Sequence, residues 1–130
     1  MKNIYFDNNA TTPTRPEVLE AMLPYYKDIF GNASSMHSFG RSARAGVDNA
    51  RESVARLIGA KEPREIIFTS GGTESDNFAI KGIAWSLKEK GKHIITSTIE
   101  HHAVLNAVKF LEKEGFRTSY AGVDKYGIVD

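Results

Sequence analysis

Short apolar runs alternate with longer stretches of helical periodicity between residues 65 and 123, and this alternation restricts the possible folds more than any other feature. Three runs are rich in β-branched or aromatic residues and short enough for strands: 66–69, 93–97 and 117–123. Helical patterns at 73–90 and 101–114 separate them, and a glycine ends each helix. Strands joined by helix-length crossovers pair in parallel. The order therefore predicts an α/β fold, a mostly parallel sheet flanked by helices.

The part of the chain before these runs predicts a mainly helical segment. Four features are expected in turn: a short strand at 4–6, a loop with Pro13 and Pro16, and helices at 17–30 and 42–58. Pro24 should end or kink the first helix, because proline lacks the N–H group and its ring clashes with the preceding turn. Gly59 is well placed to end the second helix. The polar connection between the helices, GNASSMHSFGRSA, is a candidate for ligand binding, since loops often carry sites.

The composition excludes several classes of function. Lys and Arg number 17 and Asp and Glu number 16, so the charge offers no basis for binding nucleic acid or an anionic membrane surface. Cysteine is absent, which excludes disulfides, a thiolate metal site and a cysteine nucleophile within the chain. The start of the chain does not resemble a secretory signal, and no apolar run reaches the roughly 18 residues of a membrane span. We therefore expect a cytoplasmic protein.

A pair of glycines, Gly71 and Gly72, follows the run at 66–69 and opens the next helical pattern. Ligands of open α/β sheets bind beyond the carboxyl ends of the strands. A helix N-terminus at that edge offers free N–H donors and a partial positive charge. The segment is therefore a candidate phosphate site, to which Thr73 and Ser75 add hydroxyl donors.

Two observations argue against a phosphate at this segment. Glu74 and Asp76 carry negative charge close by unless they point away, and a plain turn with a capping box from Thr73 to Asp76 would explain the same residues. The segment is neither a P-loop nor the G-x-G-x-x-G dinucleotide fingerprint. From spacing alone, both interpretations stay open.

His101 occupies the equivalent position after the run at 93–97, at the start of the next helix. The positive end of a helix disfavours imidazolium, so we expect a neutral ring that suits stacking on a flat ligand. A capping or solvent-facing histidine is the alternative. His102 is expected to be structural, and no His-x-x-x-His pair indicates a metal. The segment at 7–13, DNNATTP, reads on its own as a turn.

The combination of these motifs resembles a known family. The chain is similar to the N-terminal part of the cysteine desulfurases of the NifS/IscS type, which are pyridoxal-phosphate enzymes of the class V aminotransferase family with fold type I. The resemblance covers the whole chain, and several linked motifs in the right order are more specific than any one of them. The matching segments are YFDNNATTP, FGNASSMHSFGRSA, REIIFTSGGTESDN, GKHIITSTIEHHAVL and EGF.

The resemblance implies roles for particular residues. Gly72 and Thr73 would bind the phosphate of pyridoxal 5'-phosphate through backbone N–H groups and the Thr73 hydroxyl, and His101, the catalytic candidate, would stack on the pyridine ring. Residues 1–15 would reach toward the active site, and 16–130 would form the first part of the cofactor-binding large domain. Four further residues would lie near the substrate pocket, the last of them toward the dimer-facing side: Asn9, Ala10, Thr11 and His37.

A reaction is implied as well. Cysteine would be converted to alanine, and its sulfur would pass to an enzyme cysteine as a persulfide, for iron–sulfur cluster or thio-cofactor synthesis. A homodimer is implied, with L-cysteine as substrate and scaffold or tRNA-thiolation proteins as sulfur acceptors. The lysine that carries the cofactor and the persulfide cysteine have no match here, so the 130 residues alone are expected to be an inactive N-terminal part.

Two alternatives remain open. The chain could belong to another class V enzyme, such as a selenocysteine lyase or an aminotransferase. It could instead be a short product without catalysis that acts as a binding or assembly module. A parallel sheet of three strands would leave an unpaired apolar edge, which favours an incomplete fold, although the N-terminal helices could cover that edge.

Overall fold

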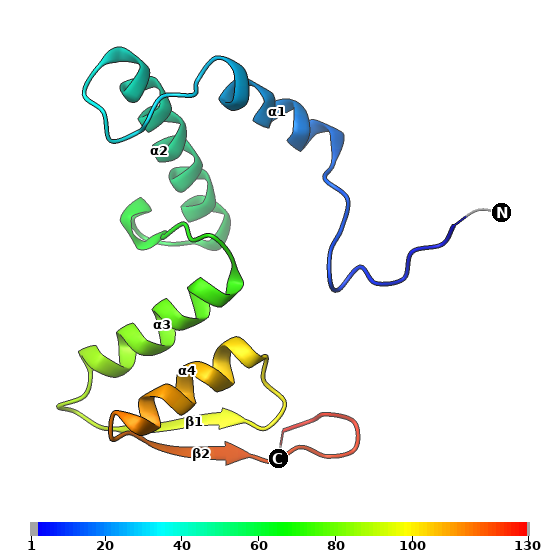
Figure 1. The fold of residues 1–130 in the computed structure, drawn as a ribbon, viewed down its shortest axis with the longest axis vertical. Helices are drawn as coiled ribbons and strands as arrows, with labels where there is room; N and C mark the ends of the chain where they lie inside the picture. Colours follow the sequence, from blue (N-terminus) through cyan, green and yellow to red (C-terminus); the bar gives the residue numbers. More distant parts are fainter. Residues whose placement is uncertain (1–2, 130) are drawn as a thin grey trace. The chain divides into compact units, whose positions relative to one another are not determined.

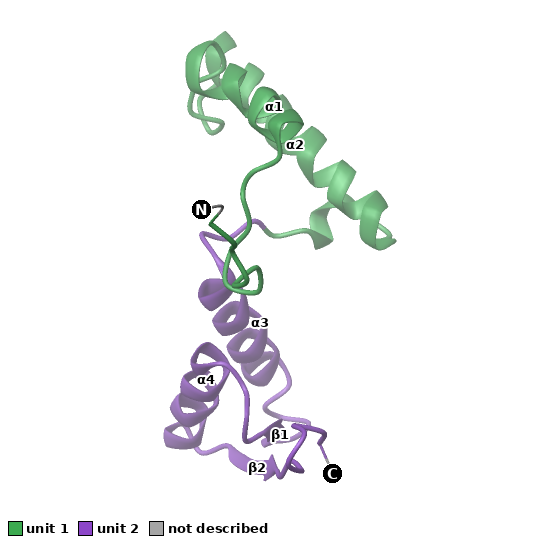
Figure 2. Ribbon diagram, turned by 90° about the vertical axis from the view of Figure 1, so that its right-hand side faces the viewer, with its two compact units in different colours: residues 1–67 green, residues 68–130 purple. Residues whose placement is uncertain are grey.

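The computed structural model describes residues 3–129, which fall into two compact units divided between Ile67 and Phe68 (Figure 2). The elements of this part of the chain, shown in Figure 1, are α1 (Pro16–Lys27), α2 (Ser38–Ile58), the short 3-10 helix η1 (Pro63–Glu65), α3 (Gly72–Ser86), β1 (His93–Ser97), α4 (His102–Lys113) and β2 (Arg117–Ala121). None of the described helices is long and apolar enough to cross a membrane.

The second unit is a β–α–β crossover preceded by a helix. β1 and β2 pair in parallel, in a register that sets His93 opposite Arg117 and Ser97 opposite Ala121. α4 connects the two strands, and α3 packs beside α4 and runs in the same direction (Figures 1 and 2). The predicted strand at 93–97 and the predicted parallel pairing are confirmed, and with them the α/β class.

One face of α4 forms the core of this unit. Four of its side chains and one that follows it are buried: Ala103, Ala107, Val108, Leu111 and Phe116. Their spacing is that of a single helix face, as the sequence predicts. Gly115 then ends the helix at φ 87°, in the left-handed region that favours glycine. Trp85 of α3 meets Phe110 of α4 edge to face, with ring centroids 6.3 Å apart, and so ties the two helices together.

The apolar face of α3 stays partly open. Together with the start of β1 it lines a groove of about 530 Å³. The positions of the predicted helix 73–90 that the sequence predicts to face inward all line this groove: Ile80, Ile83, Ala84 and, just after α3, Leu87. In the described part of the chain this face therefore borders a groove instead of a filled core, and Ile83 is 61% exposed.

Close backbone approaches shape the first unit. Tyr25 of α1 lies against Gly46 of α2, where an added Cβ atom would collide with the tyrosine ring. Gly40, in the first turn of α2, is buried against carbonyl groups of the preceding loop, so no larger residue fits there. Arg51 fastens α2 to the segment that follows it, because its Nε donates to the Ile66 carbonyl oxygen at 3.1 Å.

Two of the predicted strands are not formed in the described residues. The segments 4–6 and 66–69 are irregular, because β1 and β2 pair with each other and no strand pairs with either segment. A strand needs a partner for its N–H and C=O groups, so β propensity alone does not make one. The predicted strand at 117–123 forms, but it ends at Ala121.

The first helix differs from its prediction at the proline. α1 continues through Pro24 and ends at Lys27, so of the two expected effects of the proline, an end or a kink, the end is not observed. The fixed φ of proline is itself helical, so the helix loses one backbone hydrogen bond without having to stop. The Pro24 carbonyl accepts from the N–H groups of Asp28 and Ile29 at 2.8 and 2.9 Å, which closes the last turn.

The other helix boundaries differ from their predictions by about one turn or less. α2 begins at Ser38 instead of 42, because the Nδ1 atom of His37 accepts from the Gly40 N–H at 3.3 Å and caps the helix. Its end at Gly59 is confirmed, with φ at 71°. α3 ends at Ser86 instead of 90, and turns occupy the remaining residues.

Replacing Leu111 by alanine should destabilise the second unit, since Leu111 is 0% exposed and its loss leaves a cavity. We expect the free energy of unfolding to fall by about 2–5 kcal/mol. Urea denaturation followed through the fluorescence of Trp85, the single tryptophan of the chain, measures it. Ile99→Ala is the control in the same unit, because Ile99 is 59% exposed. An equal loss from both changes would show that Leu111 is not in the core.

Replacing Gly59 by alanine should also destabilise the protein, because alanine is strained at its φ of 71°. The expected loss is about 1–2 kcal/mol in the free energy of unfolding. Gly91→Ala is the matched control: an added Cβ meets no atom within 4 Å at either glycine, but Gly91 does not have a positive φ. Gly91→Ala should be neutral or slightly stabilising, since it restricts the unfolded chain. Thermal denaturation of both variants decides the point.

Candidate functional site

The pair of glycines predicted to bind an anion lies at the start of α3. Gly71 immediately precedes the helix, and no side chain caps it. The first backbone hydrogen bond of this turn runs from the Ser75 N–H to the Gly71 carbonyl, at 3.1 Å. The N–H groups of Gly72, Thr73 and Glu74 therefore donate to no acceptor in the described part of the chain. They stay available to a ligand, and the helix adds its partial positive charge.

Open space borders both glycines. A Cβ atom placed on Gly71 or Gly72 would meet no other atom within 4 Å, so no described residue fills this position. The Thr73 hydroxyl makes no hydrogen bond within residues 3–129, while the Thr73 carbonyl accepts from the Asn77 side chain at 2.9 Å. Free backbone donors and a free hydroxyl thus lie beside a space that a ligand can enter.

Side-chain hydrogen bonds tie the loop before α3 to the helix in two places. In the first, the serine–glutamate clasp, Glu74 Oε2 accepts from the N–H and the hydroxyl of Ser70, both at 2.7 Å. In the second, the hydroxyl clasp, Ser75 Oγ lies 2.6 Å from Thr69 Oγ1. Since one of these hydroxyls donates to the other, the remaining one donates to the Gly71 carbonyl, at 3.2 or 3.3 Å.

The structure corrects one prediction about this turn and excludes one alternative. Ser75 is not a free donor, because its hydroxyl is engaged in the hydroxyl clasp. The capping box from Thr73 to Asp76 is not formed either, because the helix begins earlier and the residue before it, Gly71, has no side chain to donate or accept.

The carboxylate of Glu74 is ionised at neutral pH. The hydrogen bond from the backbone N–H of Ser70, and after it the bond from the Ser70 hydroxyl, hold the pKa of Glu74 below its ordinary value, against a small opposing effect of burial. Its Oε2 atom is turned back onto the loop by both bonds. The Glu74 carboxylate is thus engaged with the loop that leads into the glycine pair.

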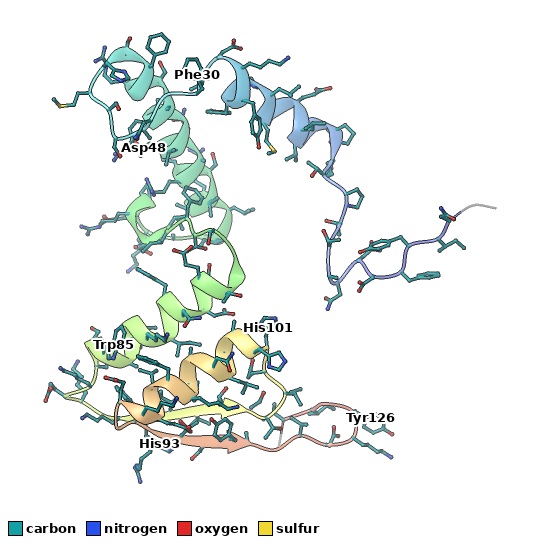
Figure 3. The ribbon with its side chains drawn as sticks, viewed as in Figure 1. Phe30, Asp48, Trp85, His93, His101 and Tyr126 are labelled. Carbon is teal, nitrogen blue, oxygen red and sulfur yellow. The ribbon has the colours of Figure 1, made fainter. Side chains whose placement is uncertain are left out.

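His101 caps α4. Its Nδ1 atom accepts from the Ala103 N–H at 3.1 Å. His101 is exposed, and its ring, labelled in Figure 3, has its centroid 6.2 Å from that of His102. The residue is therefore a capping histidine, which is the alternative that the sequence left open, and stacking on a flat ligand stays a prediction.

The two predicted sites lie at one end of the second unit. Figures 1 and 2 show that α3 and α4 run side by side and begin at the same end, toward which β1 also points. The structure therefore brings Gly72 and Thr73 to the same end as His101, as their equivalent places after strand-like runs predict. The apolar groove lies along the later part of α3, which places it apart from this end.

The remaining predicted site residues belong to the first unit. Asn9, Ala10 and Thr11 are exposed, and the Ala10 N–H closes a turn onto the Asp7 carbonyl at 3.0 Å. His37 is exposed as well and caps α2. The part of these four residues in a site stays a prediction.

The serine–glutamate clasp was not predicted from the sequence. Its signal is a serine and a glutamate that lie four residues apart on either side of the glycine pair. A similar pair precedes α4, where the Ser97 hydroxyl donates to Glu100 Oε1 at 3.0 Å. Residues 3–129 contain no group of three or more His, Cys, Asp or Glu that could hold a metal ion.

Known sequences are similar to the chain along its whole length. The cysteine desulfurase IscS of Dictyoglomus turgidum is 59% identical over 129 residues, which cover 99% of this chain and 32% of that protein. A cysteine desulfurase of Rattus norvegicus is 50% identical over 131 residues, which cover 100% of this chain and 29% of that protein. The chain thus spans about a third of the length of the curated relatives that it matches.

Solved structures of related proteins are also similar to the chain over most of its length. The structure of a NifS-like protein superposes with a TM-score of 0.90 and 43% sequence identity, covering 99% of this chain and 35% of that one. The resemblance to the NifS/IscS-type desulfurases is therefore confirmed in sequence and in fold. The model of the family described as "Aminotransferase class-V" matches residues 4–130. The chain belongs to the class V aminotransferase family.

Proposed function

We propose that the protein is a cysteine desulfurase that uses pyridoxal 5'-phosphate, and that this chain supplies the phosphate-binding turn and the histidine that stacks on the cofactor ring. One observation carries the proposal. The N–H groups of Gly72 and Thr73 and the Thr73 hydroxyl are unengaged at the end of the unit where His101 also lies. The relatives that are cysteine desulfurases support the choice of reaction.

A phosphate monoester fits the turn at the start of α3. Phosphate oxygens accept hydrogen bonds from backbone N–H groups and hydroxyls, and the positive end of the helix favours their charge. Because Gly72 has no Cβ and open space beside it, a phosphate oxygen can approach the backbone closely. Thr73 adds a second donor through its hydroxyl, which no other described residue uses.

His101 suits the ring of the same cofactor. The hydrogen bond from the Ala103 N–H fixes one edge of the imidazole and leaves the face of the ring available for stacking. Pyridoxal phosphate, when bound, supplies the electron sink for the bond changes at the substrate. His101 orients that ring and shields it from water on one side.

The finer parts of the proposal concern substrate and partners. L-cysteine is the substrate, L-alanine is the product, and the sulfur leaves as a persulfide on a thiol. SspA supports this choice, since its structure was solved in complex with cysteine; it superposes with a TM-score of 0.80 and 46% identity, covering 89% of this chain and 33% of that one. Asn9, Ala10 and Thr11 contribute to the substrate pocket, and His37 lies toward the dimer-facing side. The protein acts as a cytoplasmic homodimer that passes sulfur to a scaffold or tRNA-thiolation protein.

The reaction is tested on the protein at its full natural length, purified with pyridoxal phosphate. L-cysteine should yield L-alanine and an equal amount of sulfur, released as sulfide when a reducing thiol is present. L-serine, which carries a hydroxyl in place of the thiol, should yield no alanine. Alanine from L-selenocysteine but none from L-cysteine would overturn the assignment in favour of a selenocysteine lyase.

The phosphate assignment is tested by Thr73→Ala, which removes a hydroxyl donor and should weaken binding of pyridoxal phosphate about tenfold or more, since a hydrogen bond to a charged group contributes about 1.5–3 kcal/mol. Absorbance titration of the apoprotein measures the dissociation constant. His102→Ala is the control, because His102 begins α4 but does not cap it. It should change affinity by no more than about twofold. Equal losses from both variants would count against the assignment.

A further inference from the structure

We propose that Glu74 is a positioning residue of the phosphate-binding turn: its clasp on Ser70 holds Gly71 and Gly72 so that the free N–H groups at the start of α3 stay directed at the phosphate. The inference rests on the proposed function, because it concerns the same turn. Glu74 touches neither the cofactor nor the substrate in this role, and it acts through the backbone that it holds.

The turn needs an external restraint. Two consecutive glycines give a backbone segment with more conformational freedom than any other pair of residues. Apart from the chain neighbours and the backbone of α3, no atom lies within 4 Å of the position of either missing Cβ, so no side chain packs against the turn there. Donors that must be ordered when the ligand binds weaken the affinity by the entropy of ordering them.

The serine–glutamate clasp supplies this restraint from both sides of the glycines. Ser70 precedes the pair, Glu74 follows it by two residues, and two bonds of 2.7 Å join them. Bonds this short to an ionised carboxylate are among the stronger hydrogen bonds in proteins. The hydroxyl clasp adds to it through neutral groups, of which only one at a time reaches the Gly71 carbonyl. The Ser70–Glu74 pair is therefore the main restraint on the turn.

The charge of Glu74 and its acceptor oxygen have opposite effects on phosphate binding, so the two effects can be tested separately. A carboxylate near the phosphate repels it, whereas the acceptor oxygen of the clasp helps the turn to bind it. Glutamine keeps an acceptor oxygen at the same place and removes the charge. Alanine removes both. A positioning role therefore predicts that Glu74→Ala weakens phosphate binding and that Glu74→Gln does not.

The experiment titrates the apoprotein, at its full natural length, with three probes: pyridoxal phosphate, inorganic phosphate and pyridoxal, which lacks the phosphate. Glu74→Ala should weaken binding of pyridoxal phosphate and of inorganic phosphate about three- to tenfold, the effect expected for one net hydrogen bond. Glu74→Gln should stay within about twofold of the wild type or bind more tightly. Affinity for pyridoxal should be the same in the wild type and both Glu74 variants, because pyridoxal has no phosphate for the turn to bind. If Glu74 only supported the fold, its replacement would weaken the binding of pyridoxal together with that of the two phosphate probes.

Asp76→Ala is the matched control. Asp76 also carries a carboxylate in the first two turns of α3, but this carboxylate makes no hydrogen bond within residues 3–129. Its loss should leave phosphate affinity unchanged or slightly raised. Ser70→Ala removes the hydroxyl bond and keeps the backbone one, so it should give a smaller loss than Glu74→Ala. It also decides the question if Glu74→Ala fails to fold, since an unchanged affinity in Ser70→Ala would then overturn the inference.

The outcomes separate the inference from the proposed function. If the wild type binds neither phosphate probe, both fall together. If the wild type and its Thr73→Ala variant behave as proposed but Glu74→Ala binds as tightly as the wild type, the inference alone is wrong. If both Glu74 variants bind the phosphate probes more tightly than the wild type, Glu74 only repels the phosphate. If both bind them equally more weakly, the charge of Glu74 supports binding and the acceptor oxygen of the clasp does not. Either result overturns the positioning role.

Discussion

Burial of one face of α4 beside the paired strands is the interaction on which the second unit depends. Val108 and Leu111 are almost completely buried there, and the crossover through α4 makes β1 and β2 parallel. In such an arrangement the strands end, and the helices begin, at the same edge. This packing places the unengaged N–H groups of α3 and the ring of His101 at the same end of the unit. No hydrogen bond between these two described groups contributes to that placement.

The two helices use that edge in different ways. α4 is capped by its own preceding residue, since His101 accepts from the Ala103 N–H. α3 has no such cap, and its first N–H groups donate to no acceptor in the described residues. A cap typically contributes about 1 kcal/mol to stability, so the open start of α3 is a local loss. The bonds from Ser70 to Glu74 offset part of it and leave the donors free.

Glu74 shows what a residue list leaves out. From the sequence, its charge beside the glycines argued against an anion. In the structure the carboxylate accepts twice from Ser70, which supplies a structural reason for a glutamate at this place. Ser75 is the opposite case, since a hydroxyl counted as a donor for a ligand is already engaged with Thr69.

The sequence by itself determined the strand at His93–Ser97, the buried face of α4, the glycines that end α2 and α4, and the two helix starts that form the candidate site. These depend on neighbours within a few positions, through side-chain periodicity and the backbone freedom of glycine. Only the tertiary structure decided that 66–69 and 4–6 are not strands, that α1 passes Pro24, and which polar atoms bond at the glycine pair. A strand forms only beside another strand, and a hydroxyl or carboxylate has several possible hydrogen-bond partners. Both outcomes therefore depend on distances that only the folded chain sets.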